Sequence, residues 1–325
     1  MVDRRGDLMR DGSSSTIEAD IRTGRGFEPA YIGLHRTGEL AKRVRTALEM
    51  LRACRVCPRG CGVNRSEGEI GVCNAPLKAK VSSVGPHYGE EPPLVGFRGS
   101  GTIFFSHCNL KCVFCQNSDI SQIGHGYEVS AEELARKMLQ LQNIGCHNIN
   151  FVTPTPYVPQ ILEALELAVK SGLNLPLVYN CGGYESVGTI RLLDGVVDIY
   201  MPDFKYGDDE AARKYSKADN YFARCAEAME EMHRQVGVLK TDERGIAQRG
   251  LLIRHLVMPH GLAGSERVFE FIADELSKDS YVNIMAQYYP SHRAHEFHQL
   301  TRRITSTEYQ EADEIARSFG LYRGF

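Results

Sequence analysis

Three cysteines near the middle of the chain have a spacing that suits an iron–sulfur cluster. The segment FFSHCNLKCVFCQN carries the pattern C-x3-C-x2-C at Cys108, Cys112 and Cys115. Thiolates bind the irons of a 4Fe–4S cluster, which has four irons to ligate. Three thiolates therefore leave one iron open to a small molecule, and the spacing predicts a catalytic cluster. A zinc-binding loop and three unrelated buried thiols are the alternatives that this pattern leaves.

A second group of cysteines lies upstream and follows the pattern C-x2-C-x3-C-x11-C, at Cys54, Cys57, Cys61 and Cys73. Four thiolates can close either a tetrahedral zinc site or another iron–sulfur cluster. The glycines between them permit the tight turns that a metal-binding knuckle needs. A metal would stabilise a small module that has little core of its own. The spacing does not choose between zinc, a second cluster and metal-free thiols.

Charged residues also occur where apolar runs end. Asp203 and Lys205, two positions apart in the segment YMPDFK, share one face of the chain as it leaves an apolar run. Arg254 lies inside the run LLIRHLVMP, where a charged residue is rarely buried without a partner. His255 points the other way and is expected to be a hydrogen-bonded core histidine. A plain ion pair at the rim is the alternative interpretation of Asp203 and Lys205.

From residue 101 onward, short apolar runs alternate with helical segments that must position these residues. The six runs are Thr102–Phe105, Ile149–Thr153, Leu175–Tyr179, Val196–Met201, Leu251–Met258 and Val282–Ala286. The helical segments are 130–144, 157–171, 185–194, 208–235 and 265–277. Ser130 and Glu133 form a capping box at the start of the first helical segment.

Six strand–helix repeats with near-continuous apolar strands favour a parallel sheet covered by helices. We predict an α/β fold, a partial (β/α)6 barrel with an N-terminal cysteine-rich extension; an open doubly wound sheet is the alternative. Barrel enzymes carry their catalytic residues on loops at the carboxyl ends of strands. The loop that begins after Phe105 is therefore well placed for chemistry.

Four segments are expected along the chain. Residues 1–30 are rich in Gly, Ser, Asp and Arg without periodicity and are expected to form a flexible tail. Residues 31–100 combine a helix with the cysteine-rich metal-binding segment, and residues 101–290 form the barrel. Residues 291–325 form a C-terminal helical extension that packs on the outside.

Composition and charge narrow the class of protein. The chain has 325 residues, 42% of them hydrophobic and 24% charged, which is ordinary for a globular protein. A net charge of −3 and the lack of a long basic run give no specific signal for nucleic acid. Neither a secretory signal nor a run of ~20 apolar residues that could span a bilayer is present. We therefore expect a cytoplasmic protein with no membrane partner.

Cysteine usage agrees with that compartment, in which thiols stay reduced. The chain has ten cysteines, and seven of them fall between Cys54 and Cys115. Such clustering is better explained by metal ligation than by disulfides. The isolated Cys146, Cys181 and Cys225 are expected to be buried small hydrophobic residues.

Taken together, these motifs resemble the radical S-adenosylmethionine (SAM) superfamily, and within it the proteins related to pyruvate formate-lyase activating enzyme. The resemblance covers roughly residues 54–290. It implies a 4Fe–4S cluster on Cys108, Cys112 and Cys115, with the amino and carboxylate groups of SAM on the open iron. Many relatives have Gly where this chain has His107, a difference that leaves all three ligands intact.

The resemblance also implies which residues surround SAM. Relatives carry a Gly-Gly-Glu-Pro turn after the second strand, where this chain has Thr153-Pro-Thr-Pro156. Thr153 and Thr155, with their backbone carbonyls, are what remains to bind the SAM amino group. Asn180, in the segment YNCGGY, stands where relatives have Asp near the ribose and carboxylate.

By the same resemblance, Asp203 and Lys205 face the SAM pocket, and Arg254 pairs with the SAM carboxylate or ribose. Asn283 and Gln287, on the sixth run, point toward the same mouth. Ligand binding and simple structural hydrogen bonding are both open for Asn283 and Gln287.

The implied chemistry is reductive cleavage of SAM to methionine and a 5′-deoxyadenosyl radical, which abstracts hydrogen from a substrate. The electron donor is expected to be flavodoxin- or ferredoxin-like. The substrate is either a small molecule or a partner protein, with a backbone glycine of a glycyl-radical enzyme as one possible target. The alternative is a noncatalytic, zinc-stabilised binding or regulatory protein on the same barrel. The intact C-x3-C-x2-C opposes that alternative, since a structural site normally has a fourth ligand.

Overall fold

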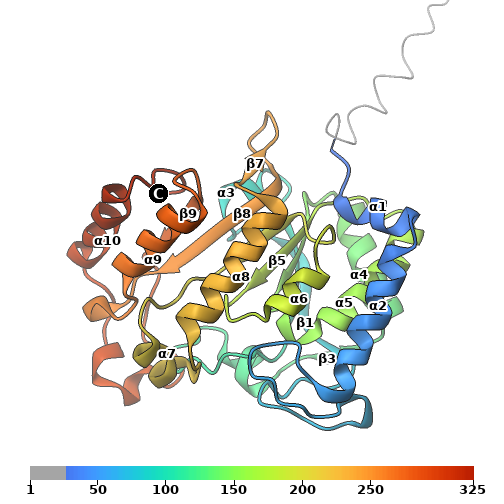
Figure 1. Ribbon diagram of the computed structural model, residues 1–325, viewed down its shortest axis with the longest axis horizontal. Helices are drawn as coiled ribbons and strands as arrows, with labels where there is room; N and C mark the ends of the chain where they lie inside the picture. The colour runs from blue at the N-terminus through green and yellow to red at the C-terminus, as the bar shows by residue number, and fades with distance from the viewer. Residues whose placement is uncertain (1–26) are drawn as a thin grey trace, which may run out of the picture.

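The computed structural model describes residues 27–325, which are drawn as a coloured ribbon in Figure 1. The tail expected over residues 1–30 lies, as far as residue 26, outside the described residues. Helix α1 (Ala30–Arg36) begins at the end of that segment. Its first backbone amide, on Ala30, donates to the buried Asp198 carboxylate, which also accepts from the Leu177 amide. This hydrogen bonding ties the start of the described chain to the barrel.

The six predicted apolar runs form six strands that pair in parallel in chain order. They are β2 (Ser100–Phe105), β4 (Ile149–Val152), β5 (Leu177–Cys181), β6 (Ile199–Pro202), β8 (Ala247–Leu256) and β9 (Tyr281–Met285). The predicted α/β fold with the parallel sheet of a partial barrel is therefore confirmed. These strands are apolar on both faces because helices cover one face and the barrel interior takes the other.

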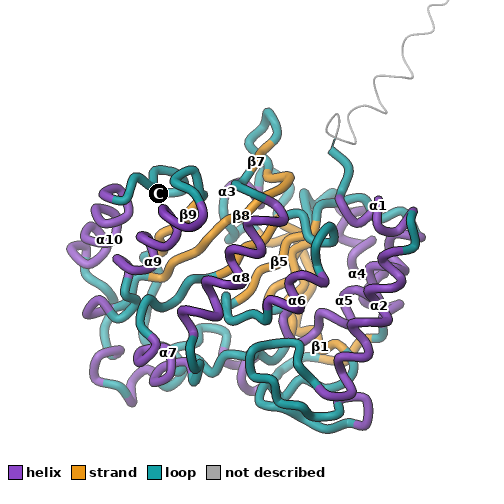
Figure 2. Tube along the Cα trace, viewed as in Figure 1, coloured by secondary structure: helices purple, strands orange, loops and turns teal. Residues whose placement is uncertain are grey.

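Helices connect successive parallel strands, as predicted. They are α4 (Ala131–Ile144), α5 (Val158–Lys170), α6 (Val187–Leu192), α7 (Asp209–Ser216), α8 (Tyr221–Val236) and α9 (Ser265–Phe271), which a π-turn (Ile272–Leu276) extends. The expected capping box is present at α4, because the Ser130 hydroxyl accepts from the Glu133 amide and the Glu133 carboxylate accepts from the Ser130 amide. In Figure 2 the purple helices surround the orange strands.

The helical segment predicted over 208–235 is two helices. Lys217 and Asn220 have φ angles of 53° and 52°, in the left-handed region, so α7 ends and α8 starts anew. Neither residue is a glycine or proline, and the sequence therefore carried no strong signal for the break.

Two antiparallel strands extend the sheet beyond β2. Strand β1 (Ala79–His87) pairs with β2, and β3 (Tyr127–Val129) pairs with β1. Residues 74–100 are rich in Gly and Pro, which predicts irregular chain with short strands, and the nine-residue β1 is longer than that prediction. Its sequence, AKVSSVGPH, alternates only weakly between apolar and polar residues, which explains the difference.

The segment after β1 enters the barrel. His87 pairs with Ser100, at the amino end of β2, and short helix α3 (Pro92–Val95) follows. Leu94 of α3 packs with interior side chains of the sheet, Val178, Ile199, Met201 and Leu252. Residues just before α3 are thereby carried into the interior of the barrel.

Helices at both ends of the chain cover the outside. Helix α2 (Glu39–Glu49) packs on α5, which lies against α4, and these helices form one side of the molecule in Figure 1. A 3-10 turn (Met50–Ala53) continues α2 directly into Cys54. Helix α10 (Ser306–Ser318) packs against α9, on the outside as predicted.

The remaining elements are short. They are β7 (Lys240–Thr241), the π-turn Asp119–Ile123, and 3-10 turns at Arg65–Glu67, Thr155–Tyr157, Pro259–Gly261, Ala294–Glu296 and His298–Leu300. Within residues 27–325, no helix has the length and apolar character needed to cross a membrane.

Candidate active site

Polar side chains from three neighbouring strands meet at the carboxyl ends of the parallel sheet. Asn180 lies near the end of β5, Asp203 directly follows β6, and Arg254 lies near the end of β8. Strand β5 pairs with β6, and a bridge joins Asp203 to Arg254, so the three residues are in register. The structure therefore brings together three of the residues that the resemblance assigned to SAM.

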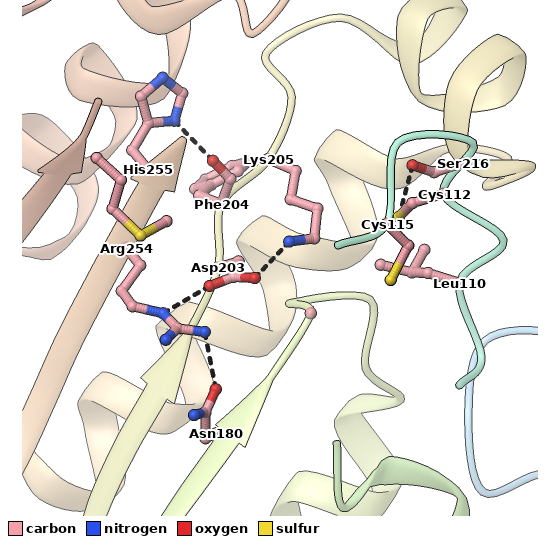
Figure 3. A network of polar contacts seen from close by, with 12 residues as sticks. Leu110, Cys112, Cys115, Asn180, Asp203, Phe204, Lys205, Ser216, Arg254 and His255 are labelled. Carbon is pink, nitrogen blue, oxygen red and sulfur yellow. Dashed lines mark hydrogen bonds and ion pairs between the residues drawn. The ribbon is translucent and has the colours of Figure 1, made fainter. Parts of the chain in front are cut away.

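Asp203 lies between two cations (Figure 3). Arg254 Nε donates to Asp203 Oδ1 at 2.7 Å, and Lys205 Nζ donates to Asp203 Oδ2. Arg254 also donates from Nη2 to Asn180 Oδ1 at 2.8 Å. Asp203 and Lys205 thus form an ion pair, and the first partner of Arg254 is Asp203.

The pKa of the Asp203 carboxyl reflects these contacts. Burial opposes ionisation of Asp203, but the Arg254 and Lys205 cations outweigh it and hold this pKa below its ordinary value. Burial likewise opposes the charge on Lys205, and Asp203 raises the Lys205 pKa above its ordinary value. The three groups therefore stay charged, and the site presents a fixed pattern of charges.

The loop of Cys108, Cys112 and Cys115 follows β2 and lies beside Lys205. Hydrogen-bond donors reach the sulfurs. The Leu110 amide lies 3.4 Å from Cys108 Sγ, and Ser216 Oγ lies 3.0 Å from Cys112 Sγ (Figure 3). Ser121 Oγ lies 3.1 Å from Cys115 Sγ. Such contacts stabilise sulfur ligands and tune the potential of an iron–sulfur cluster.

Backbone hydrogen bonds fix the course of this loop. The amides of Lys111 and Val113 donate to the carbonyls of Ser216 and Tyr215 at the end of α7. The Arg293 amide donates to the Val113 carbonyl, so the C-terminal extension holds the loop from the other side. The loop geometry is therefore set by two segments that follow it by about 100 and 180 residues.

Cys108, Cys112 and Cys115 have the donor chemistry of a thiolate-bound iron–sulfur cluster. Burial raises the pKa of the Cys108 thiol to about 12 and that of Cys112 to about 11, and nearby Lys205 opposes both increases. Among residues 27–325, no three His, Cys, Asp or Glu side chains converge closely enough to share one metal ion. A 4Fe–4S cluster does not need such convergence, because each thiolate binds a different iron.

Two residues of the site hold a left-handed backbone. His107, just before the first cysteine, has a φ of 71°, and Thr153 has a φ of 59°. A positive φ is uncommon outside glycine and is an outlier for a β-branched residue such as Thr. Strain of this kind costs on the order of 1–3 kcal/mol and concentrates at functional sites. The positive φ at His107 also explains why glycine suits this position in relatives.

The Thr153–Pro156 turn directs its second threonine inward. Thr155 is buried, and its hydroxyl donates to Glu185 Oε1 at 2.7 Å. Tyr179 donates its hydroxyl to Glu185 Oε2 at 3.1 Å. The hydroxyl of Thr155 is therefore engaged with Glu185, and the backbone of the turn is what can face a ligand.

Glu185 is a residue that the sequence analysis missed. It is fully buried, and burial raises its pKa to about 7, although the hydrogen bonds from Thr155 and Tyr179 lower it. The acid that relatives carry in the turn itself is absent here, but a carboxyl from the loop after β5 contacts the same turn. Only the position of this glutamate after the YNCGGY segment could have pointed to it.

Glycines let the same loop pass close to Asp203. A Cβ at Gly183, whose φ is 77°, would lie 2.2 Å from the Asp203 carbonyl oxygen. A Cβ at Gly182 would lie 2.7 Å from Leu110, in the cysteine loop. The two glycines of YNCGGY therefore bring the ends of β5 and β6 and the cysteine loop into contact.

The second cysteine set forms a compact knuckle. The Cys54 amide donates to Val63, and the Gly62 amide donates back to Cys54. Burial raises the pKa of the Cys57 and Cys73 thiols, and the neighbouring cysteines raise both further. The four thiols therefore lie near enough to one another to interact electrostatically.

Two arginines connect this knuckle to the active-site loops. Arg59 donates from Nε to the Asn109 carbonyl at 2.9 Å, and its guanidinium lies 5.4 Å from the Tyr184 ring centroid. Arg65 is only 1% exposed and donates to the carbonyls of Pro156 and Pro76. No carboxylate of residues 27–325 forms an ion pair with Arg65, and its Nε has no hydrogen-bond partner there.

The remaining predicted residues have other contacts. Asn283 donates to Glu91 at 2.9 Å, so it contacts the segment between β1 and α3. The Gln287 carbonyl accepts from Gln116, and its side chain lies by Met285 Sδ. The structure does not bring Gln287 to the Asp203 ion pairs.

His255 is buried between the Phe204 carbonyl and Ser265 Oγ, and burial lowers its pKa to about 4, as expected for a core histidine. The isolated cysteines are buried as predicted; they are Cys146, Cys181 and Cys225.

The chain is similar in sequence to several known proteins. A family profile described as the radical SAM superfamily matches residues 102–243. The chain is 37% identical over 289 residues to an uncharacterized protein, MJ0674, of Methanocaldococcus jannaschii, covering 86% of this chain and 78% of that protein. It is 29% identical over 133 residues to the pyruvate formate-lyase-activating enzyme of Clostridium pasteurianum, covering 38% of this chain and 53% of the enzyme. Among solved structures, HydG, a maturase of the FeFe hydrogenase, matches 69% of this chain and 50% of its own, at 11% identity and a TM-score of 0.46.

The Glu185→Gln variant should show a distinct dependence of stability on pH. The raised pKa means that folded protein retains a proton which the unfolded chain releases near pH 4.5, so wild-type stability falls as pH rises from about 4.5 to about 7. Gln resembles the protonated acid and does not titrate. From pH 5 to pH 8.5, the free energy of unfolding of the variant should rise relative to wild type by on the order of 1–3 kcal/mol. Urea unfolding under anaerobic conditions measures this difference, and a difference independent of pH would contradict the assignment.

Proposed function

The chain belongs to the radical SAM superfamily and is a radical SAM enzyme, and on that premise we propose that Cys108, Cys112 and Cys115 hold its 4Fe–4S cluster. The observation that carries this proposal is the position of the three thiols after the first parallel strand, beside Lys205 and Asp203. When bound there, such a cluster supplies one electron that breaks the C5′–S bond of SAM, giving methionine and a 5′-deoxyadenosyl radical that takes hydrogen from a substrate.

The chain's own residues would orient SAM at that cluster. Lys205 is held by Asp203 and adds positive charge beside the thiolates. Arg254 and Asn180 offer a paired guanidinium and amide to the polar groups of SAM. Thr153 and Thr155 present backbone carbonyls to its ammonium group, with Glu185 fixing the second threonine.

The electron donor and the substrate follow from similarity alone. We propose a flavodoxin- or ferredoxin-like donor, because the similarity to an activating enzyme suggests that class of chemistry. A backbone glycine of a partner protein is the target that the same similarity supports; a small molecule is the other candidate. The barrel itself does not determine the substrate.

We further propose that Cys54, Cys57, Cys61 and Cys73 bind a metal centre, either zinc or an auxiliary iron–sulfur cluster. No three of these thiols converge on one position among residues 27–325. Zinc would therefore require the knuckle to tighten around it, whereas a cluster would take each thiolate on a different iron. The support is electrostatic. A buried arginine without a carboxylate partner is costly, and Arg65 lies close enough to Cys73 to lower its pKa. Four thiolates around a metal carry net negative charge, which would compensate the Arg65 cation.

Replacing the three loop cysteines tests the main proposal. After anaerobic reconstitution with iron and sulfide, wild-type protein given reductant and SAM should release 5′-deoxyadenosine, measured by liquid chromatography. The Cys108→Ala, Cys112→Ala, Cys115→Ala variant should release none, because the cluster has lost its ligands. Cys146→Ala, another buried cysteine, is the matched control and should retain the activity. Equal release by the triple variant would refute the assignment.

The metal centre proposed at the four upstream cysteines can be tested separately. Wild-type protein should contain zinc, or iron beyond the four atoms of one 4Fe–4S cluster, and the variant with all four upstream cysteines changed to Ala should lack that excess. In Arg65→Met, this metal should pass to a chelator on the order of tenfold faster, a change of about 1.4 kcal/mol. Arg55→Met removes an exposed arginine of the same knuckle and should release metal at the wild-type rate. Identical metal content in wild type and the four-cysteine variant would contradict the proposal.

A further inference from the structure

Two glutamates inside the barrel have no role in the chemistry described above. Glu90 and Glu91 lie between β1 and α3, in the segment that enters the barrel. Their side chains are only 7% and 5% exposed. Asn283, on β9, donates to Glu91 Oε1 at 2.9 Å. Strands β1 and β9 lie toward opposite ends of the strand order, so this contact spans the region where the sheet does not close on itself.

The two cations of the site, Arg254 and Lys205, make their shortest contacts with residues other than these glutamates. Arg254 makes its short hydrogen bonds to Asp203 and Asn180. Its distances to the glutamates are longer, 3.8 Å to Glu90 Oε2 and 4.0 Å to Glu91 Oε1. Lys205 pairs with Asp203. The interior therefore holds three carboxylates, on Asp203, Glu90 and Glu91, with two permanent cations.

Residues 27–325 leave both glutamates short of hydrogen-bond donors. Glu91 Oε2 is buried and has no hydrogen-bond partner among residues 27–325. Glu90 accepts no hydrogen bond from this part of the chain, and the nearest imidazole nitrogen, His87 Nδ1, lies 3.4 Å away. Burial raises the Glu90 pKa, and Glu91 and Asp203 raise it further, although Arg254 and His87 lower it. A buried carboxylate in this condition needs one more positive donor. Buried carboxylates that lack hydrogen-bond donors recognise a protonated amine or a guanidinium group, because the N–H groups of these cations are charged donors.

We propose that Glu90 and Glu91 bind a protonated amine or guanidinium group of the substrate from which hydrogen is abstracted. This inference rests on the proposed function, because it names the substrate class of the same barrel. The cation would supply the missing charge beside Arg254 and donate to Glu91 Oε2. A small-molecule amine and a Lys or Arg side chain of a peptide present the same chemistry, and the test separates the two.

The experiment measures binding and stability, not turnover. Reconstituted protein with bound SAM is titrated calorimetrically with 1,5-diaminopentane, with agmatine and with a short lysine- and arginine-containing peptide. At least one of these probes should bind wild type, and its affinity should fall by roughly tenfold or more in Glu90→Gln, Glu91→Gln protein. Glu128→Gln, an exposed glutamate on β3, is the matched control and should bind like wild type. Binding of the diamine or agmatine identifies a small molecule, and binding of the peptide alone identifies a side chain.

Stability separates ligand binding from a structural role. If Glu90 binds a cation of the substrate, its buried charge is uncompensated when no amine is present. The Glu90→Gln variant removes that charge and should then unfold at the same temperature as wild type or at a higher one. A lower unfolding temperature for Glu90→Gln would overturn the proposal, as would equal probe affinities or no binding to wild type. Failure of the proposed function can be told apart from these outcomes, because it would appear as absence of SAM cleavage by the wild-type protein.

Discussion

The site depends on one buried carboxylate, Asp203, held between two cations. Because it follows β6 directly, it lies between the ends of β5 and β8 and accepts from Arg254 on one side and from Lys205 on the other. Removing one partner of such a buried pair typically costs about 3–5 kcal/mol. Asp203 thereby holds Lys205 beside Cys112 of the cysteine loop and Arg254 beside Glu90 and Glu91 in the barrel interior. These are the two sides of the proposed reaction.

Hydrogen bonds tie the loops around this ion pair to one another. The cysteine loop is held by α7 and by the C-terminal extension, and the upstream cysteine knuckle reaches it through Arg59. Arg65 joins the same knuckle to the Thr153–Pro156 turn. Strained backbone at His107 and Thr153 persists because these contacts over-determine both loops. The knuckle is therefore part of the active-site framework as well as a metal-binding candidate.

Much of the fold was predictable from local sequence patterns, but parts of the fold and of the candidate site depend on contacts between residues far apart in the sequence. Apolar runs predicted the six parallel strands correctly, and the two ligand sets that cysteine spacing predicts stay predictions. The break between α7 and α8 was not predictable, because Lys217 adopts a left-handed conformation without a glycine. Glu185 and Glu91 were not predicted as site residues, because they are placed there by hydrogen bonds with residues far away in the sequence. Glu185 bonds with Thr155, 30 residues away, and Glu91 bonds with Asn283, 192 residues away. The pairing of Asp203 with Arg254 likewise needs strand register, which the sequence does not specify.

The most direct measurement is the affinity of the reconstituted Asp203→Asn variant for SAM, beside wild type and the exposed control Asp274→Asn. Iron and sulfide content show that each protein carries its cluster. If Asp203 orients Lys205 and Arg254 toward SAM, the variant should keep its cluster and bind SAM at least roughly tenfold more weakly, a loss of about 1.4 kcal/mol. Wild-type affinity in a fully loaded Asp203→Asn variant would contradict the central role of this carboxylate.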